Sequence, residues 1–327
     1  MIEAIVLGDI NIDVLMSIAA YPSPGGDAPA AQVITRAGGS AANTASALAK
    51  LGVGVRMIGR VGEDAWAEMA MRALAGSGVD VSAVQRDAGA QTGLFFLPVT
   101  PDGERTMFGY RGANARTDAS GIARESFIGA RLLHLSGYAL LESPQREAAW
   151  RASELAAQHG ASVSLDIGLQ PALSVAGEIR RLLSGLSICV LGMDEAHALV
   201  DAVAPEDAIE ALVGRGVQTV GLKLGAEGCL IGGASGAHRL PGFRVPTVDT
   251  TGAGDAFSAG LIFGHLRGLS LPAAGALANA LGALATSVWG AGPALPGRFE
   301  AIRLLREVGD EYAGQAIRAL EGIQIDE

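Results

Sequence analysis

Residues 250–255 combine an anion site with a proton acceptor. They read Thr-Thr-Gly-Ala-Gly-Asp and lead into an alanine-rich helical pattern that begins near Asp255. Consecutive backbone N–H groups at the start of a helix attract an anion, and the helix dipole adds to that attraction. A carboxylate at the same helix start can take a proton from a nucleophile that attacks the anion. Asp255 can alternatively be only a helix cap, but glycines at 252 and 254 favour a binding site.

A second cluster, residues 37–45, reads Ala-Gly-Gly-Ser-Ala-Ala-Asn-Thr-Ala. Gly38 and Gly39 allow the backbone to approach a ligand closely, and Asn43 can both donate and accept a hydrogen bond to a hydroxyl. The alternative interpretation is a helix start that packs tightly on a sheet. Neither cluster matches a Walker phosphate loop, and no Gly-x-Gly-x-x-Gly follows the first expected strand, which disfavours a dinucleotide site.

The elements that must position these clusters alternate along the chain. Short β-rich runs followed by alanine-rich helical patterns predict a parallel sheet covered on both faces, with ligands at the carboxyl ends of its strands. The expected strands are residues 4–7, 55–60, 93–99, 132–135, 162–166, 188–191, 219–224 and 229–232. The expected helices are residues 41–51, 65–77, 144–159, 179–183, 194–200, 205–215, 255–267 and 273–288.

Two stretches, residues 12–32 and 91–112, break this rhythm. They read as short strands and turns with little helix between them. We therefore expect them to pair into a small β-sheet that projects from the main body.

Charge and composition exclude several classes of partner. The net charge is −10 and the only lysines are Lys50 and Lys223, whereas a nucleic-acid backbone requires clustered Lys and Arg. We therefore expect no nucleic-acid partner. The two cysteines cannot form a disulfide framework or a four-thiolate zinc site.

The uncharged stretch of residues 269–297 is long enough to span a bilayer. Pro272, Asn279 and several glycines interrupt it, which favours a buried helix followed by a loop. The N-terminus carries no basic leader and reads as a strand. We expect a cytoplasmic protein with no membrane partner.

The two clusters, in this order and at this separation, resemble the two signature segments of the ribokinase-like carbohydrate kinases, the phosphofructokinase B family. Residues 8–13, Gly-Asp-Ile-Asn-Ile-Asp, resemble the N-terminal strand of that family. Residues 222–228, Leu-Lys-Leu-Gly-Ala-Glu-Gly, resemble its nucleotide-binding strand and turn. The resemblance covers essentially the whole chain.

The resemblance implies an α/β fold, a three-layer α/β/α sandwich with a mainly parallel central sheet and a small β-sheet lid. It implies one domain over residues 1–327, with the lid built from about residues 12–36 and 91–115. The implied activity is transfer of the γ-phosphoryl group of ATP to a hydroxyl of a small sugar or related polyol, with Mg²⁺ and K⁺ as cofactors. Members often dimerise through their lids, which implies a homodimer.

The resemblance also assigns roles to single residues. Asp255 matches the catalytic base, and Gly252, Ala253 and Gly254 match the anion hole. The positions that hold sugar hydroxyls are matched by Asp13, Gly39 and Asn43. The nucleotide side is matched by Lys223, Gly225, Gly228 and Asn279, although Asn279 can alternatively be a satisfied polar group in a buried helix.

Three further residues match metal positions. Glu195 matches a residue that helps to organise Mg²⁺, while Asp249 and Thr251 match ligands of a monovalent cation, with carbonyl groups from residues 288–294. Two departures touch this chemistry. Gly192 stands where members often carry Asn, and residues 166–170 lack the Asn and Arg of many sugar kinases. These losses keep open a catalytically degenerate protein that senses a sugar or nucleotide.

The sugar is not decided by the residues. Arg111 follows Tyr110 in a segment that resembles fructokinases and 2-keto-3-deoxygluconate kinases, where an arginine can meet an acidic or polar sugar. An exposed strand arginine is the alternative. Phe95, Phe96 and Phe108 also leave a nucleoside open, since a base would stack on an aromatic wall.

Overall fold

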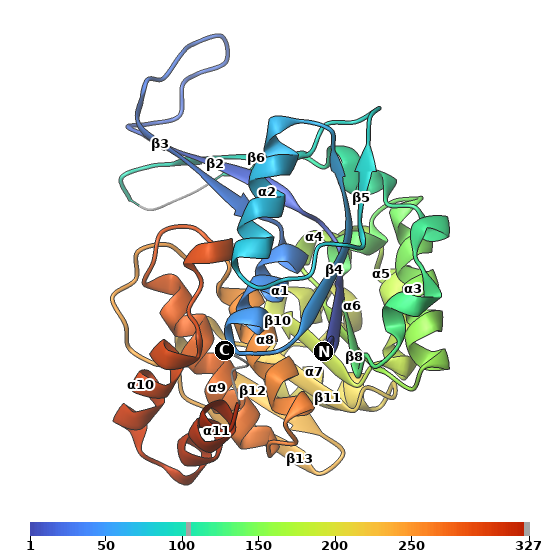
Figure 1. Cartoon of the computed structure of the whole chain (residues 1–327). Helices are drawn as coiled ribbons and strands as arrows, with labels where there is room; N and C mark the ends of the chain where they lie inside the picture. The colour runs from blue at the N-terminus through green and yellow to red at the C-terminus, as the bar shows by residue number, and fades with distance from the viewer. Residues whose placement is uncertain (103–105, 324–327) are drawn as a thin grey trace.

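The computed structural model describes residues 1–102 and 106–323, which form two β-sheets (Figure 1). The larger sheet has nine strands in the order β13-β12-β11-β10-β9-β8-β1-β4-β5. Neighbouring strands from β11 to β5 are parallel, whereas β12 is antiparallel to both β11 and β13. The strands are β1 (Ala4–Leu7), β4 (Val55–Gly62), β5 (Val84–Asp87), β8 (Leu132–Ser136), β9 (Ser162–Asp166), β10 (Ile188–Gly192), β11 (Thr219–Lys223), β12 (Cys229–Gly233) and β13 (Gly236–Leu240).

Helices cover both faces of this sheet, and each face has its own apolar core. One core is lined by α1 (Ser40–Lys50), α2 (Ala65–Gly76), α8 (Ala253–Leu266), α9 (Leu271–Thr286), α10 (Arg298–Val308) and α11 (Glu311–Glu321). The other is lined by α3 (Gln145–Gln158), α4 (Leu169–Ser174), α5 (Ala176–Leu182), α6 (Met193–Val200) and α7 (Pro205–Val213). The predicted three-layer α/β/α sandwich with a mainly parallel sheet is confirmed.

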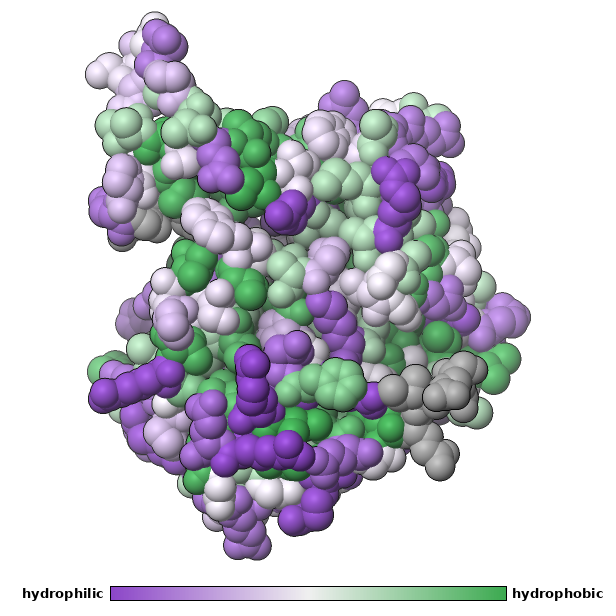
Figure 2. Space-filling model, turned by 60° about the vertical axis from the view of Figure 1, so that its left-hand side comes forward, coloured by the Kyte–Doolittle hydropathy of each residue, from purple (hydrophilic) through white to green (hydrophobic). Residues whose placement is uncertain are grey.

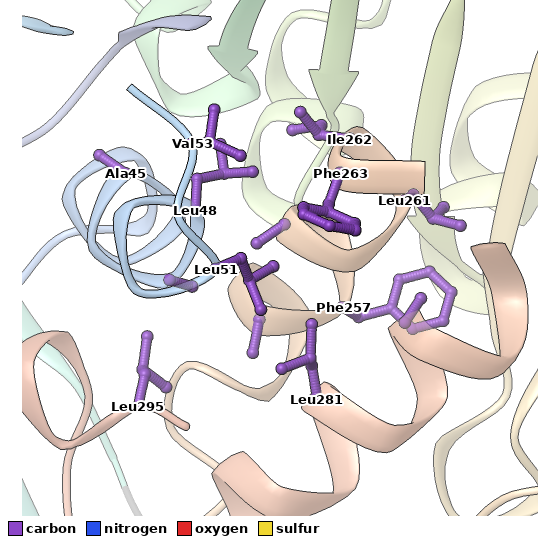
Figure 3. Close-up of a cluster of buried hydrophobic side chains, with 14 of the residues drawn as sticks. Ala45, Leu48, Leu51, Val53, Phe257, Leu261, Ile262, Phe263, Leu281 and Leu295 are labelled. Carbon is purple, nitrogen blue, oxygen red and sulfur yellow. The ribbon is translucent and has the colours of Figure 1, made fainter. Parts of the chain in front are cut away.

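The two helices that begin at the glycine clusters, α1 and α8, share an apolar core with α9 (Figure 3). Leu48 of α1, Phe257 and Phe263 of α8 and Leu281 of α9 are all buried. Replacing a buried Phe by Ala costs roughly 3–5 kcal/mol of folding free energy, so these contacts hold the helices firmly. They therefore fix the distance between the first turn of α1 and the first turn of α8.

The second sheet has four strands in the order β3-β2-β6-β7 and projects from the body (Figure 1). Its strands are β2 (Asn11–Ile18), β3 (Ala30–Gly38), β6 (Gly93–Val99) and β7 (Phe108–Tyr110). β2 pairs with β3 antiparallel and with β6 parallel, and α2 contacts its base. The predicted small sheet is confirmed. Residues 103–105, within the stretch expected to form the lid, lie outside the described residues.

Several boundaries and elements differ from the predictions. Helix α8 begins at Ala253, two residues before the predicted start, because Gly252 adopts the left-handed cap conformation. Strands β5 and β13 and helices α4, α10 and α11 were not predicted. In α10 the signal was present, since Ala301, Ile302 and Leu305 follow helical spacing and are buried. By contrast, β13 is exposed except at Leu240, so its pattern carries no apolar signal.

The uncharged stretch of residues 269–297 forms α9 and a loop, as predicted. Within the described part of the chain, no helix has the length and apolarity needed to cross a membrane.

Candidate active site

The first turn of α8 places the anion-hole candidates at the carboxyl edge of the central sheet. Gly252 is the N-cap with φ of 78°, and α8 runs on from Ala253 through Gly254 to Asp255. N–H groups in the first turn of a helix lack acceptors within the helix, so they point outward to an anion. The N–H of Ala253 also donates to Thr250 O at 3.3 Å.

The carboxylate of Asp255 is held by two side chains of α1. Ser40 Oγ donates to Asp255 Oδ1 and Asn43 Nδ2 donates to Asp255 Oδ2, each at 2.8 Å. Asn43 Oδ1 in turn accepts from Gly292 N at 3.0 Å. Asn43 was expected on sugar hydroxyls, and in this structure both ends of its amide meet protein groups. Ser40 was missed by sequence reasoning, although a spacing of three residues puts it on the same helix face as Asn43.

The environment of Asp255 raises its pKa to about 6. Loss of solvent around the carboxylate is the main cause, the negative charge of Asp166 adds to it, and the hydrogen bonds from Asn43 and Ser40 oppose it. A carboxylate with a raised pKa is a better proton acceptor near neutral pH, which is the property that a general base needs.

Lys223 reaches the same turn from the end of β11. Its Nζ lies 3.0 Å from Asp166 Oδ1, and Ser258 Oγ donates to Asp166 Oδ2 at 2.8 Å. A Cβ on Gly254 would lie 3.3 Å from Lys223 Nζ, so the ammonium borders the anion hole. Burial alone would lower the pKa of Lys223, but Asp166 and the carboxylates beyond it outweigh burial and raise it. Lys223 is therefore a cation at the helix start.

A cavity of about 840 Å³ opens beside this turn. It is lined by all four expected nucleotide-side residues, Lys223, Gly225, Gly228 and Asn279, and also by Ala253 and Gly254. Phe243 and Arg244 line it as well and were not predicted, because they lie in an irregular segment without a motif.

Asn279 and Gly228 shape one wall of this cavity. The side chain of Asn279 is buried and donates to Leu240 O at 3.2 Å and to Pro241 O at 3.1 Å. Gly228 has φ of 99°, and a Cβ there would collide with Leu240 O. Asn279 is thus a polar group with its hydrogen bonds satisfied in a buried helix, and it also borders the cavity.

The sugar-side candidates lie at the base of the second sheet. Asp13, on β2, is 8% exposed and packs its carboxylate against Gly38, where a Cβ would collide with it. Gly39 has φ of 99° and caps α1 directly beside the backbone of Asp9. The structure therefore brings Asp13 and Gly39 to the end of α1 that also carries the partners of Asp255.

Arg111 is partly buried, with its side chain 16% exposed, and lies in a network of acceptors. Its Nε and Nη2 bond Asp9 Oδ2 and Oδ1 at 3.1 and 2.9 Å, and its Nη1 bonds Glu142 Oε1 at 2.8 Å. Nη2 also donates to Tyr138 O and to Gln145 Oε1. The exposed-strand interpretation is wrong, and two carboxylates neutralise this guanidinium. Asp9 was missed because its partner is 102 residues away.

The metal candidates fall into two places. Glu195 accepts a hydrogen bond from Gly192 N at the start of α6, and its charge acts on Lys223. Asp249 Oδ1 accepts from Thr251 N and Oγ1 at 2.9 and 2.7 Å, while Asp249 Oδ2 accepts from Gly290 N at 2.9 Å. Within residues 1–102 and 106–323, no group of three or more His, Cys, Asp or Glu side chains could hold a metal ion.

The comparison with known families decides what this arrangement belongs to. The sequence model of the pfkB family carbohydrate kinases matches residues 1–298. The chain belongs to the pfkB family of carbohydrate kinases. It is an ATP-dependent sugar kinase of the ribokinase type.

Relatives with assigned names span almost the whole chain. Fructokinase-1 of Oryza sativa subsp. japonica is 32% identical over 91% of this chain and 96% of its own length. The ATP-dependent ribose-1-phosphate kinase of Halopiger xanaduensis is 33% identical over 89% of this chain and 94% of its own length. Among solved structures, the ribokinase of Arabidopsis thaliana complexed with ribose and ATP superposes with a TM-score of 0.82 at 26% identity, covering 93% of this chain and 99% of that one.

Proposed function

We propose that this kinase phosphorylates a hydroxyl of a small neutral sugar, with Asp255 as the catalytic base and the amides of residues 252–254 as the anion hole. One observation carries the proposal. The carboxylate of Asp255, held by Ser40 and Asn43, lies in the same helical turn that borders the 840 Å³ cavity. A proton acceptor and an anion site one residue apart are what transfer of a phosphoryl group to a hydroxyl requires.

The reaction follows from these groups. Asp255 accepts the proton of the sugar hydroxyl, and the hydroxyl oxygen forms a bond to the γ-phosphorus of ATP. The bond from that phosphorus to the β,γ-bridging oxygen breaks, and ADP leaves with the electron pair. The amides of residues 252–254 and the Lys223 ammonium compensate the charge on the γ-phosphoryl oxygens during transfer.

We also propose that Glu195 serves Mg²⁺ and that Asp249 and Thr251 serve a monovalent cation. The carboxylates of Asp166, Asp255 and Glu195 all act on the Lys223 ammonium at this edge, and carboxylate oxygens are ligands that Mg²⁺ prefers. Mg²⁺ bound to the phosphates would supply further neutralisation there, with Glu195 acting through water. Asp249 and Thr251, with carbonyls of residues 288–294, would hold the monovalent cation, since Asp249 already joins those two segments.

Charge balance favours a neutral substrate over a sugar acid. Among the described residues, Asp9, Asp13 and Asp255 place carboxylates at the sugar side, and Arg111 is already matched by Asp9 and Glu142. A sugar carboxylate would need a free cation, whereas sugar hydroxyls are good donors to carboxylates. We therefore propose that Arg111 orients Asp9 toward the sugar and does not itself bind an acid group.

We also propose that the chain is one domain whose second sheet is a lid, and that two lids pack in a homodimer. Phe96 pairs with Phe108 across the sheet, and Val33 lies further along the same face. These side chains are 41%, 56% and 56% exposed, and apolar side chains gather on the projecting sheet in Figure 2. A second copy would cover them. Sedimentation should give a dimer mass, and Phe108→Ser should give a monomer; a wild-type monomer would refute the dimer.

The activity test is a coupled assay of ADP release over neutral pentoses and hexoses, sugar acids, sugar phosphates and nucleosides. We expect turnover on a neutral sugar and a loss of kcat between about 10²- and 10⁴-fold in Asp255→Asn, with ATP affinity retained. Faster turnover on a sugar acid would contradict the neutral substrate. Full activity in Asp255→Asn would show that this residue is not the base. If the wild type binds a sugar or nucleotide but turns over none of the compounds, the result would favour a catalytically degenerate sensor.

A further inference from the structure

The loop of residues 288–295, called the hub loop below, contacts both Asn43, which bonds the base candidate, and Gly252 at the start of the anion hole. Gly292 N donates to Asn43 Oδ1 at 3.0 Å, and Asn43 holds the catalytic-base candidate. A Cβ on Gly252 would lie 3.0 Å from Leu295 Cδ2, so the far end of the loop packs on the start of α8. The position of this loop therefore sets both the orientation of the base and the start of the anion hole.

Lys50 lies at the end of α1 that is away from Asp255, and there it holds the hub loop. Its Nζ donates to Pro293 O at 2.5 Å and to Leu295 O at 2.6 Å. Both bonds are charge-assisted and therefore stronger than bonds between neutral groups. Burial lowers the pKa of Lys50, and the Glu300 carboxylate opposes that effect. Of the two lysines in the chain, this one does not line the nucleotide cavity.

Helix α1 connects Lys50 with Asp255. The helix begins at Ser40, whose hydroxyl bonds Asp255, and ends at Lys50, so it is about 15 Å long. Its residues from Ala41 to Leu48 are buried, and Leu48 packs in the core with α8 (Figure 3). Side chains of a helix lean toward its N-terminus, which directs the ammonium back to the hub loop. One rigid element thus holds Asp255 directly at one end and through the hub loop at the other.

We propose that Lys50 is a positioning residue for phosphoryl transfer, whose ammonium holds the carbonyls of Pro293 and Leu295 and so keeps the hub loop in the geometry that transfer needs. The inference rests on the proposed function of Asp255 and the anion hole. Lys50 acts through the loop and through Asn43. Its removal therefore lowers the rate of transfer more than the affinity for either substrate.

An open cavity makes this inference testable by chemical rescue. A cavity of about 490 Å³ lies on the outer side of the hub loop and is lined by Lys50, Leu295, Arg298 and Arg303, among others. Lys50→Ala removes three methylene groups and the ammonium, which together have the size of propylammonium. The cavity gives that amine a route to the two carbonyls. Arg303→Ala, at an exposed residue of the same cavity, is the matched control.

The experiment measures kcat, KM for ATP, KM for sugar and thermal unfolding of wild type, Lys50→Ala, Lys50→Arg and Arg303→Ala. We expect kcat of Lys50→Ala to fall between about 10- and 100-fold, with both KM values within about threefold of wild type. Propylammonium should restore kcat in a saturable manner, and 1-propanol, which lacks the charge, should not. Lys50→Arg should retain most of the activity, and Arg303→Ala should retain all of it.

Two outcomes would overturn the inference. Unchanged kcat in folded Lys50→Ala would show that the bonds to the hub loop do not bear on transfer. If kcat is reduced equally in Lys50→Ala and Lys50→Arg, and propylammonium does not restore it in Lys50→Ala, then Lys50 has a packing role only. Absence of turnover in the wild type on every compound would instead refute the proposed function, so the two failures are distinguishable.

Discussion

The nucleotide side and the sugar side of this kinase are built by different means. The lining of the 840 Å³ cavity includes several glycines, Gly225, Gly228, Gly242 and Gly282, and it also includes Lys223. The sugar side is built from side-chain charges. Asp9 meets Arg111 there, and Arg111 also meets Glu142 on the other side.

The two sides should therefore respond differently to substitution. A surface made of glycine backbone is altered when a side chain is added, because the new atoms collide or force an unfavourable φ. A buried network of charges is altered when one member is removed, because the remaining charge stays in a poorly solvated place. The two sides are therefore expected to separate in both stability and kinetics.

The largest effect is expected from Arg111→Met on the sugar side. The change leaves Asp9, whose side chain is 4% exposed, without its cation, which costs about 3–5 kcal/mol of unfolding free energy. The KM for sugar should rise while the KM for ATP stays unchanged. Urea unfolding and steady-state kinetics measure both. Arg306→Met breaks an exposed pair with Glu321 and should cost less than about 1 kcal/mol. Equal losses in the two variants would contradict the comparison.

The next effect is expected from Gly228→Ala on the nucleotide side. A Cβ at Gly228 collides with Leu240 O, and the φ of 99° is unfavourable for alanine. We expect the KM for ATP to rise about tenfold or more, with the KM for sugar unchanged. Gly160→Ala is the control, since its φ is also positive, 70°, nothing lies near its Cβ, and it does not line the cavity. Its strain alone should cost about 1 kcal/mol. If Gly228→Ala and its control have the same KM for ATP, the close packing of Gly228 does not shape the cavity.

The smallest effect is expected in the pH dependence of activity, which Asp255 controls where the nucleotide side meets the sugar side. Below its raised pKa of about 6, Asp255 is protonated and cannot accept a proton, so kcat/KM for sugar should fall with decreasing pH. The hydrogen bond from Ser40 lowers that pKa, so Ser40→Ala should move the inflection to higher pH. Arg306→Met, far from the carboxylate, serves as reference. If kcat/KM for sugar does not change between pH 5 and 8, Asp255 is not the base.

Local patterns predicted much of the fold correctly. Apolar periodicity located most strands of the central sheet and the helices between them, because alternation and helical spacing are properties of a few neighbouring residues. Some of the elements that were missed had weak patterns, such as the exposed β13, or short ones, such as α4 with six residues, whereas α10 was missed although its helical spacing was clear. The second sheet was predicted from two separate stretches, although their pairing order was not.

The residues of the candidate site were likewise predicted only where the signal is local. The glycines around residue 253 and the carboxylate that follows them were recognisable because a helix start is a local structure with its own residue preferences. Ser40 and Asp9 were missed, and Asn43 acquired different partners from those expected. Their contacts reach Asp255, Arg111 and Gly292, more than 100 residues away in each case.

The chain's residues alone determine that strands alternate with helices, that residues 252–255 start a helix able to bind an anion, and that Asp and Glu outnumber the 24 cationic Lys and Arg side chains. The folded arrangement decides which of those cations meets which acceptor. Lys50 reaches Pro293 and Arg111 reaches Asp9 because docking of α1 on α8, and of the second sheet on the first, brings distant segments together. Local propensity acts over a few residues, whereas these pairings depend on the summed packing of the whole core.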